Sequence, residues 1–526
     1  MGKNDPTTEQ PDRTKYILAM YDIRGKQGYI YKSNKIREIV GGSWIIRDCF
    51  EDCLFPAAKQ CSPKGIFTYK DQKTASEADA FTLENFEKHL SEGYIGEVIY
   101  DGGGNFFVLF KDVNVYREVN RRFYRRLLKR TYSLRVLTSY ITNLNFDDYK
   151  EDRERLYAEH RRREQKESMI SPVNTLPIVQ TDYRTSLPLA EMQQIGKKQD
   201  TNPEKVTYES KKKYEKYERE ATKTEVHNDK LLDNMITEKG EESLLAVIYI
   251  DGNNMGAQVE ACLSDLESKS YEVCTKALRE FSEGIQKHYI DNRIKEMDEI
   301  LKASKKPERR FVVAAGDEIT FVCNARNAYQ VAVEYLKKLA EDSDADTPRT
   351  SCAGIAIFHS HAPYMEAYRI AEECCESGKQ LMKREGMENV SLIDFHYCQG
   401  AFGTSLEEIR KEEETTDCSK PWFVVMPENE NADQGDNRFI SVEIVQEMQE
   451  MLQKAGRSNI KNLAFAAKKS TADFQSEIER IRAHQKKEQR SDFTLDGKLT
   501  DPELQRKLIY DMAIVYDLWF DKKGEV

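Results

Sequence analysis

Two stretches of this 526-residue chain repeat one order of secondary-structure elements, and this duplication constrains the fold more than any other feature. In the first stretch, an apolar strand at 16–22 precedes a helical pattern at about 32–50 and two apolar runs at 98–110 joined by glycines. A helical pattern at 113–129 and an apolar strand at 134–141 complete it. The order strand–helix–strand–strand–helix–strand is typical of a ferredoxin-like domain.

The second stretch repeats this order further along the chain. A buried-type strand at 244–251 ends in a carboxylate, and a long helical region follows at about 255–303. Two apolar runs at 311–323 again enclose a glycine turn, and a helix at about 327–341 leads to a strand at 352–358. We therefore predict an α+β fold with two ferredoxin-like domains.

The remaining segments differ from both stretches in composition. Charged residues dominate between the stretches, and the run at 211–220 predicts a solvated helix or a disordered loop. The segment after Pro421 shows mainly helical patterns. The predicted domains are a disordered tail at 1–14, a first ferredoxin-like domain at 15–145, a charged helical insert at 146–240, a second ferredoxin-like domain at 241–400 and a C-terminal helical domain at 421–526.

The charge balance excludes binding of nucleic acid through bulk charge. Lys and Arg number 80 against 91 Asp and Glu, which gives a net charge of −11. Any such contact therefore needs a local basic patch. The helical pattern at 113–129 offers one, a stripe that could hold RNA or the acidic face of a partner. The stripe consists of Arg121, Arg122, Arg125 and Arg126, continued by Lys129 and Arg130. Charged helix faces are usually only solvated, which is the alternative interpretation.

The chain lacks the patterns of membrane and secreted proteins. No run approaches the ~18 apolar residues that a membrane span needs, and the polar residues 1–14 do not form a signal peptide. The eleven cysteines contain no Cys-x-x-Cys pair, which predicts free thiols. We expect a cytoplasmic protein without contact to a membrane.

Three carboxylates of the second stretch stand at the ends of its strands. Asp251 ends one strand, and Asp317 and Glu318 lie on the turn between two others. These elements are neighbours in a ferredoxin-like sheet, so we expect the three side chains to lie close together. Carboxylates at that separation repel one another unless a cation lies between them, which predicts Mg²⁺ or Mn²⁺. Two such ions can activate an attacking hydroxyl and stabilise a leaving pyrophosphate.

Glycines beside these carboxylates indicate a phosphate site. Gly316 permits a tight turn, and the segment 252–256 leads into a helix whose first amides could hold a triphosphate. Asp and Gly also favour turns that bind nothing, which would explain either motif alone. The residues predicted to bind nucleotide here are Gly252, Asn253, Asn254, Gly256 and Gly316.

These motifs carry a resemblance to known families. Residues 315–318, Ala-Gly-Asp-Glu, stand where GGDEF diguanylate cyclases and the CRISPR polymerase/cyclase have Gly-Gly-Asp-Glu or Gly-Gly-Asp-Asp. The first stretch distinguishes the two families. Residues 22–31 and 102–106 resemble the first palm domain of the CRISPR type III effector large subunit, and residues 351–357 resemble the closing part of its second palm.

The resemblance implies condensation of ATP into cyclic oligoadenylates in antiviral defence, with two nucleotides held between facing palms. It implies that Asp251, Asp317 and Glu318 bind the metal and catalyse, and that Lys379 contacts phosphate. The first palm lacks a second acid and would seat the acceptor nucleotide. The residues implied there are Asp22, Gly102, Gly103, Gly104 and Asn105. Other CRISPR effector subunits and guide RNA are the implied partners.

Some features depart from that family, and two other functions remain open. None of the eight histidines is followed by Asp, so we expect the HD nuclease domain to be absent. No cysteine lies between residues 62 and 261, so we also expect the zinc ribbon common between the two palms to be missing. A non-catalytic, nucleotide-binding scaffold subunit of an RNA-guided complex is one alternative, although a scaffold has no need for three clustered acids. A GGDEF-type cyclase acting on GTP is the other, although those enzymes usually pair two identical chains.

Overall fold

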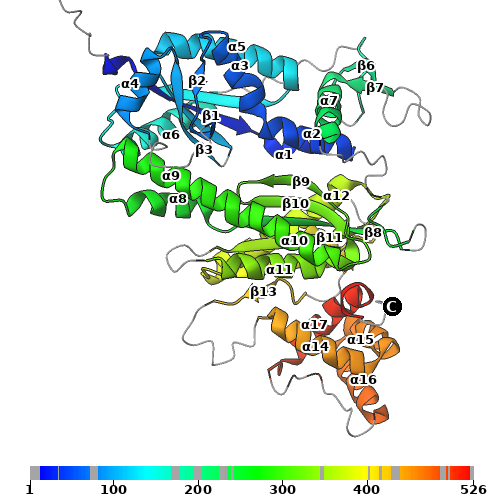
Figure 1. Ribbon diagram of the computed structural model, residues 1–526. Coiled ribbons are helices and arrows are strands. Elements are labelled where there is room, and N and C mark those ends of the chain that lie inside the picture. The colour runs from blue at the N-terminus through cyan, green and yellow to red at the C-terminus, as the bar shows by residue number, and fades with distance from the viewer. Residues whose placement is uncertain are drawn as a thin grey trace, which may run out of the picture. The chain divides into compact units, whose positions relative to one another are not determined.

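The computed structural model divides the chain into two compact units (Figure 1). The first unit comprises residues 1–229 and 256–285, and the second comprises residues 230–255 and 286–526. The described residues are 12–33, 35–71, 81–102, 104–166, 178–183, 185–193, 204–223, 232, 234–238, 242–343, 349–400, 403–413, 418–427, 439–485, 493, 495 and 498–521. Residues 1–11 of the predicted tail and Gly103 of the predicted nucleotide site lie outside them.

The first unit is built on a five-stranded sheet with the order β2-β3-β4-β1-β5. The strands are β1 (Ile17–Arg24), β2 (Ile66–Phe67), β3 (Gly96–Gly102), β4 (Asn105–Phe110) and β5 (Arg135–Ile141). The helices are α1 (Lys26–Ile30), α2 (Ile36–Arg47), α3 (Phe55–Lys59), α4 (Leu83–Ser91), α5 (Val113–Thr131), α6 (Tyr149–Lys166), α7 (Tyr208–Lys223), α8 (Met255–Ser264) and α9 (Tyr271–Ile285). A small separate sheet pairs β6 (Leu189–Gln193) with β7 (Glu204–Thr207).

Alternate residues of β1 enter two different cores, as the period of a strand requires. Ala19 and Tyr21 pack in one cluster with Phe123 of α5. Leu18 and Met20 pack in the other cluster, to which α6, α8 and α9 contribute. Both faces of the sheet are therefore covered.

Helices α8 and α9 follow β8 of the second stretch in sequence but belong to the first unit. Arg279 of α9 donates hydrogen bonds from Nε to the carbonyl oxygen of Ile99 and from Nη2 to that of Val98, both at 2.9 Å. Its guanidinium also lies 3.9 Å from the ring centre of Tyr69. The compact units therefore do not follow the chain order assumed for the predicted domains.

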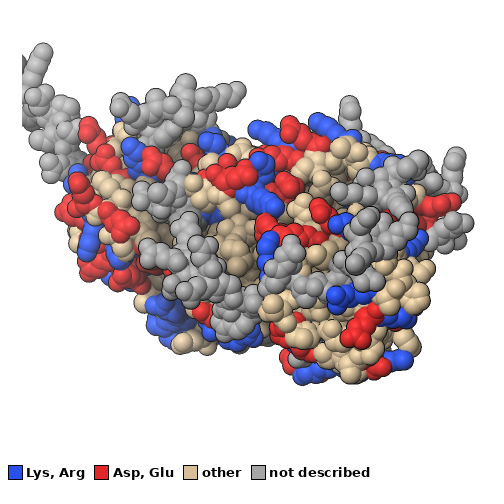
Figure 2. Space-filling view, turned by 90° about the horizontal axis from the view of Figure 1, so that it is seen from below, with Lys and Arg blue, Asp and Glu red and all other residues tan. Residues whose placement is uncertain are grey.

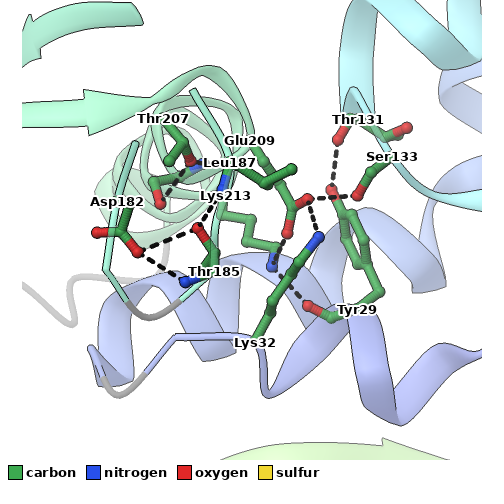
Figure 3. A network of polar contacts seen from close by, with 11 residues as sticks. Tyr29, Lys32, Thr131, Ser133, Asp182, Thr185, Leu187, Thr207, Glu209 and Lys213 are labelled. Carbon is green, nitrogen blue, oxygen red and sulfur yellow. Dashed lines mark hydrogen bonds and ion pairs between the residues drawn. The ribbon is translucent and has the colours of Figure 1, made fainter. Parts of the chain in front are cut away.

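The charged run at 211–220 forms part of α7, so the predicted helix is confirmed, but only one side of it is solvated. Lys213 and Lys216 are 1% and 5% exposed, and the ring of Tyr217 stacks on Trp44 of α2 at 5.7 Å. A side chain at Gly41 of α2 would overlap the carbonyl oxygen of Lys213, so the two helix backbones approach closely. Each buried ammonium has a carboxylate partner, which is Glu209 for Lys213 (Figure 3) and Asp48 for Lys216.

The second unit is built on a six-stranded sheet with the order β13-β12-β11-β8-β10-β9. The strands are β8 (Leu244–Gly252), β9 (Arg309–Ala315), β10 (Glu318–Asn324), β11 (Ser351–His359), β12 (Ser391–Tyr397) and β13 (Trp422–Val425). The helices are α10 (Asn292–Lys302), α11 (Ala328–Glu341), α12 (Tyr364–Glu385), α13 (Leu406–Glu413), α14 (Val442–Ala455), α15 (Arg457–Lys469), α16 (Thr471–His484) and α17 (Pro502–Val515).

Both sheets contain the ferredoxin-like strand order. The first and last strands of the motif, β1 and β5 in the first unit and β8 and β11 in the second, lie side by side and antiparallel. The middle hairpin, β3–β4 or β9–β10, pairs with the other edge of the first strand. The predicted α+β fold with two such domains is confirmed.

The C-terminal helices α14 to α17 belong to the same compact unit as the second sheet. Asp511 of α17 is fully buried and accepts hydrogen bonds from the backbone nitrogen and the hydroxyl of Ser419. The ammonium of Lys420 lies 3.3 Å from the Asp511 carboxylate. Trp519 donates from Nε1 to the carbonyl oxygen of Ala325 at 2.8 Å. These buried polar contacts attach the helices to the domain that carries the predicted carboxylates.

Two further observations concern the sequence predictions. No helix among the described residues is long and apolar enough to cross a membrane. All eleven cysteines have free thiols.

Candidate functional site

The register of the second sheet brings the three predicted carboxylates to one end of it. Ile250 of β8 pairs with Ile319 of β10, so Asp251 and Glu318, one position further in each strand, lie at the same end. A β-carbon on Gly252 would lie 2.8 Å from Oδ2 of Asp317. Asp317 therefore reaches the backbone of β8, and a side chain at position 252 would displace it.

The turn between β9 and β10 tolerates Ala315 at the position where the similar families have their first glycine. Gly316 has a φ of +65°, a conformation that side chains disfavour. Ala315 is not among the described residues with positive φ. The family's glycine at this first position is therefore not required by the backbone here, whereas Gly316 is.

Lys379 contacts the end of β8 from helix α12. Its ammonium donates to the carboxylate of Asp251 and, at 2.9 Å, to the carbonyl oxygen of Gly252. Burial opposes the charge of Lys379, but the Asp251 carboxylate outweighs it and raises the pKa of Lys379. This end of the sheet is therefore polar, and the ammonium of Lys379 partly compensates the negative charge of Asp251.

The phenol of Tyr249 lies near the same carboxylates. Burial, followed by the charges of Glu318 and Asp251, raises the pKa of Tyr249. Tyr249 therefore stays protonated, and its ring packs edge-on against Tyr368 of α12 at 5.8 Å.

The ligand atoms at this site match the preference of Mg²⁺ in kind, because they are carboxylate and carbonyl oxygens. Within the described ranges, however, no three His, Cys, Asp or Glu side chains are grouped so that they could hold a metal ion. The Lys379 ammonium provides the positive charge beside Asp251 that a metal would otherwise supply. Metal binding by Asp251, Asp317 and Glu318 stays a prediction.

The residues after Gly252 have different environments. Asn253 is 3% exposed, and its amide nitrogen donates to the hydroxyl of Thr350 at 3.2 Å and to the carbonyl oxygen of Val390 at 2.9 Å. It is therefore engaged in the fold rather than presented to a ligand. Asn254 is exposed with a φ of +55°. Gly256 is also exposed, and a β-carbon at this position would meet no atom within 4 Å.

The glycine turn of the first unit joins β3 to β4 and lies beside Asp22. Asp22 of β1 pairs with Asn105 of β4. Burial would raise the pKa of Asp22, but hydrogen bonds from His160 and Arg24 outweigh it and lower that pKa. His160 Nε2 lies 3.3 Å from Oδ2 of Asp22, and its Nδ1 lies 3.0 Å from the hydroxyl of Ser139. Sequence reasoning missed His160, which comes from the charged insert.

The predicted basic stripe on α5 is partly neutralised. Arg121 and Arg122 both form ion pairs with Glu118, at 2.7 and 2.6 Å. Arg126 donates to the carbonyl oxygen of Asp52 at 3.3 Å, and Arg125 is exposed. Figure 2 shows acidic and basic side chains interspersed over the visible face. Binding of RNA or a partner by this stripe stays a prediction.

Comparison with known proteins now assigns the second palm. Residues 244–388 match the family model described as Cas10/Cmr2, second palm domain. The similarity to that family is thus shown for this segment of the chain. It contains Asp251, Asp317, Glu318 and Lys379, so the predicted resemblance to the large subunit of type III CRISPR effectors is confirmed.

Similar solved structures are complexes named Csm1-Csm4. The cassette in complex with cA3 is 14% identical, with 72% of this chain and 54% of that chain covered and a TM-score of 0.42. The cassette in complex with cA4 is 12% identical, with 96% and 70% covered and a TM-score of 0.43. The apo cassette is 11% identical, with 94% and 70% covered and a TM-score of 0.44. The chain thus spans about half the length of the first of these relatives. No curated protein matches the chain.

Proposed function

We propose that this protein is a nucleotidyltransferase that condenses ATP into cyclic oligoadenylates in CRISPR-linked antiviral defence. The observation that carries the proposal is the gathering of Asp251, Asp317 and Glu318 at one end of a sheet that matches the Cas10/Cmr2 second palm. A scaffold would not require three acids at this position, since each adds repulsion to the folded state.

The side chains around β8 have distinct roles in this proposal. Among the described residues Asp251, Asp317 and Glu318 form no ready group of three metal ligands, so they would have to draw together around one or two divalent cations, Mg²⁺ or Mn²⁺. The ions would offset charge on the reacting phosphates and on the leaving pyrophosphate. Gly252, without a side chain, leaves the space that Asp317 occupies beside the strand. Lys379 keeps Asp251 oriented and presents a positive charge to phosphate oxygens near the end of β8.

The first palm would seat the acceptor nucleotide. Asp22 lies beside the glycine turn at 102–105 and is engaged by Arg24 and His160. It therefore serves the fold and the electrostatics of this surface rather than a metal pair. The nucleotides would be supplied as ATP, and other CRISPR effector subunits with guide RNA would be the partners of the chain.

The test is product formation by the variant Asp317→Asn. The purified protein is incubated with each nucleoside triphosphate and Mg²⁺ or Mn²⁺, and products are identified by mass spectrometry. Because Asn is nearly isosteric with Asp but uncharged, we expect the rate to fall on the order of 100-fold or more without loss of folding. The matched control is Asp298→Asn, whose carboxylate forms an ion pair with Arg309 in the same unit and is 39% exposed. Unchanged product formation by Asp317→Asn would refute the catalytic assignment.

The pairing of Lys379 with Asp251 favours one second candidate, a nucleotide-binding scaffold subunit of an RNA-guided complex. In that case the wild-type protein would bind ATP and yield no condensed product under any of these conditions. Products made from GTP alone would instead indicate a GGDEF-type cyclase.

A further inference from the structure

A cavity of the first unit lies among helices α2, α5 and α7 and the segment at 49–53. Its volume is about 200 Å³. Pockets that enclose a drug-sized molecule measure roughly 300–1,000 Å³, so this cavity suits a smaller group. Its lining contains two acidic side chains, Asp52 and Glu215, and five cationic ones. The cations are Lys129, Arg130, Lys212, Lys216 and Arg219.

The buried side of the cavity is uncharged. Ile45, Cys49 and Cys53 line it and are at most 7% exposed. Burial, followed by the charge of Asp52, raises the pKa of Cys53 to about 11, and the charge of Arg130 opposes this rise. Burial also raises the pKa of Cys49. Both thiols therefore keep their protons, and this side of the cavity adds no negative charge.

The three cations that α7 contributes have acidic partners. The ammonium of Lys212 lies 2.9 Å from Oε2 of Glu215. The ammonium of Lys216 lies 3.1 Å from Oδ2 of Asp52, and Nη2 of Arg219 lies 3.4 Å from the same oxygen. These pairs engage both acids of the lining.

Lys129 and Arg130, in the last turn of α5, have no such partner. Both are exposed, and within the described ranges neither has a carboxylate at ion-pair distance. Basic residues near a helix end often bond its last carbonyl groups. Here, however, the hydroxyl of Thr131 donates to the carbonyl oxygen of Leu127 at 2.8 Å, and the carbonyl oxygen of Thr131 accepts from the phenol of Tyr29 at 3.0 Å. Two cations thus remain uncompensated at the open side of the cavity.

We propose that this cavity binds a phosphate monoester group, which Lys129 and Arg130 hold at its open side. The lining has an excess of three positive charges, more than one carboxylate would neutralise. A phosphate monoester carries about −1.5 to −2 charges at pH 7. Guanidinium and ammonium groups form charge-assisted hydrogen bonds to its oxygens, and the uncharged side of the cavity can contact the group that bears the phosphate.

This phosphate monoester has two possible sources, a small sugar or nucleotide phosphate and the 5′-phosphate end of an RNA strand. Both present the same chemistry to the two cations, and the experiment distinguishes them. The proposal does not depend on the proposed function, because the carboxylates of the second unit take no part in it.

The experiment follows hydrogen exchange of the full-length protein during titration with ribose 5-phosphate, which both sources contain. EDTA is present so that the metal site proposed in the second unit takes up no phosphate. Peptides from the end of α5 and from α7 should exchange more slowly with ribose 5-phosphate and not with ribose, since binding suppresses local opening. Combining Lys129→Met with Arg130→Met should raise the half-saturating concentration about tenfold or more.

Two further variants separate recognition from structure. Arg130→Lys should retain most of the affinity, because it keeps the charge. The matched control is Arg117→Met, which removes an exposed arginine nearer the start of α5, and it should bind as the wild type. Without ligand, exchange in the double variant should equal that in the wild type, because both replaced side chains are exposed.

A short RNA with a 5′-phosphate, compared with the same RNA bearing a 5′-hydroxyl, distinguishes the two sources. Tighter binding of the phosphorylated RNA than of ribose 5-phosphate would assign the site to an RNA end, and the reverse would assign it to a small phosphate. The proposal would be overturned by unchanged exchange of α5 and α7 with either phosphate. Equal half-saturation in the wild type and the double variant, or equal protection by ribose, would also overturn it.

Discussion

Replacing Lys213 by Met should loosen helix α7 from helix α2. The side chain of Lys213 is 1% exposed and that of Glu209, its partner at 2.7 Å, is 3% exposed. The Lys213 ammonium also lies 4.2 Å from the ring centre of Tyr29. Methionine fills a similar volume but leaves the Glu209 carboxylate buried without this cation.

The expected loss of stability in Lys213→Met depends on the contacts that Glu209 keeps. Breaking a buried ion pair by removing one partner costs about 3–5 kcal/mol. Glu209 keeps a hydrogen bond from Ser133 and the ammonium of Lys32 at 3.2 Å. We therefore expect the lower end, about 3 kcal/mol. Adding Glu209→Gln to Lys213→Met should recover part of this loss, because the neutral amide leaves no buried charge behind.

Hydrogen exchange measured by mass spectrometry tests this directly, because it reports the opening of individual helices in a chain with two units. Peptides from α2 and α7 should exchange roughly a hundredfold faster in Lys213→Met, as a loss of about 3 kcal/mol implies. The control is Lys212→Met, the neighbouring lysine, whose pair with Glu215 has side chains 21% and 44% exposed. A surface pair contributes about 1 kcal/mol at most. Exchange in Lys213→Met that equals exchange in Lys212→Met would refute the reasoning.

Two further predictions concern the second unit. Gly354→Ala should lower the melting temperature, because its β-carbon would overlap the carbonyl oxygen of Ala371 and lie 2.5 Å from the backbone nitrogen of Cys375. The free energy of unfolding should fall by about 1–3 kcal/mol. Gly256→Ala, whose β-carbon would meet no atom within 4 Å, should leave the melting temperature unchanged. Burial, followed by the charges of Lys420 and Arg410, lowers the pKa of His396 in the folded protein to about 3. Between pH 6.5 and 3 only the unfolded chain takes up this proton, so the free energy of unfolding should fall as the pH drops through that range. His396→Gln should flatten the dependence of melting temperature on pH between 7 and 5, and an unchanged profile would contradict this assignment.

Strand patterns made much of the fold predictable from sequence. The apolar run at 244–251 predicted a buried strand, and it forms β8. Once the ferredoxin-like order was assigned, the pairing of β8 with β10 followed, and with it the meeting of Asp251 and Glu318 at one end of the sheet. The predicted strand order was therefore sufficient to locate the candidate site.

Other features depended on contacts that local patterns do not encode. In α7, Tyr214, Tyr217 and Ala221 are buried at helical spacing, a signal that was present but outweighed by the surrounding charges. The burial of Lys213 depends on Glu209, one turn away, and on the distant backbone of Tyr29. Nor could the sequence show that Lys379 would pair with Asp251, because 128 positions separate them.

The passage of residues 256–285 into the first unit has a consequence for how this protein is made. The chain passes between the units at 229–230, 255–256 and 285–286. The core around Leu18 and Met20 includes Leu263, Tyr271 and Leu278 of the inserted helices. When synthesis has reached residue 229, the first unit therefore still has an unfinished core. That domain can complete its folding only after β8, with Asp251, has also been synthesised.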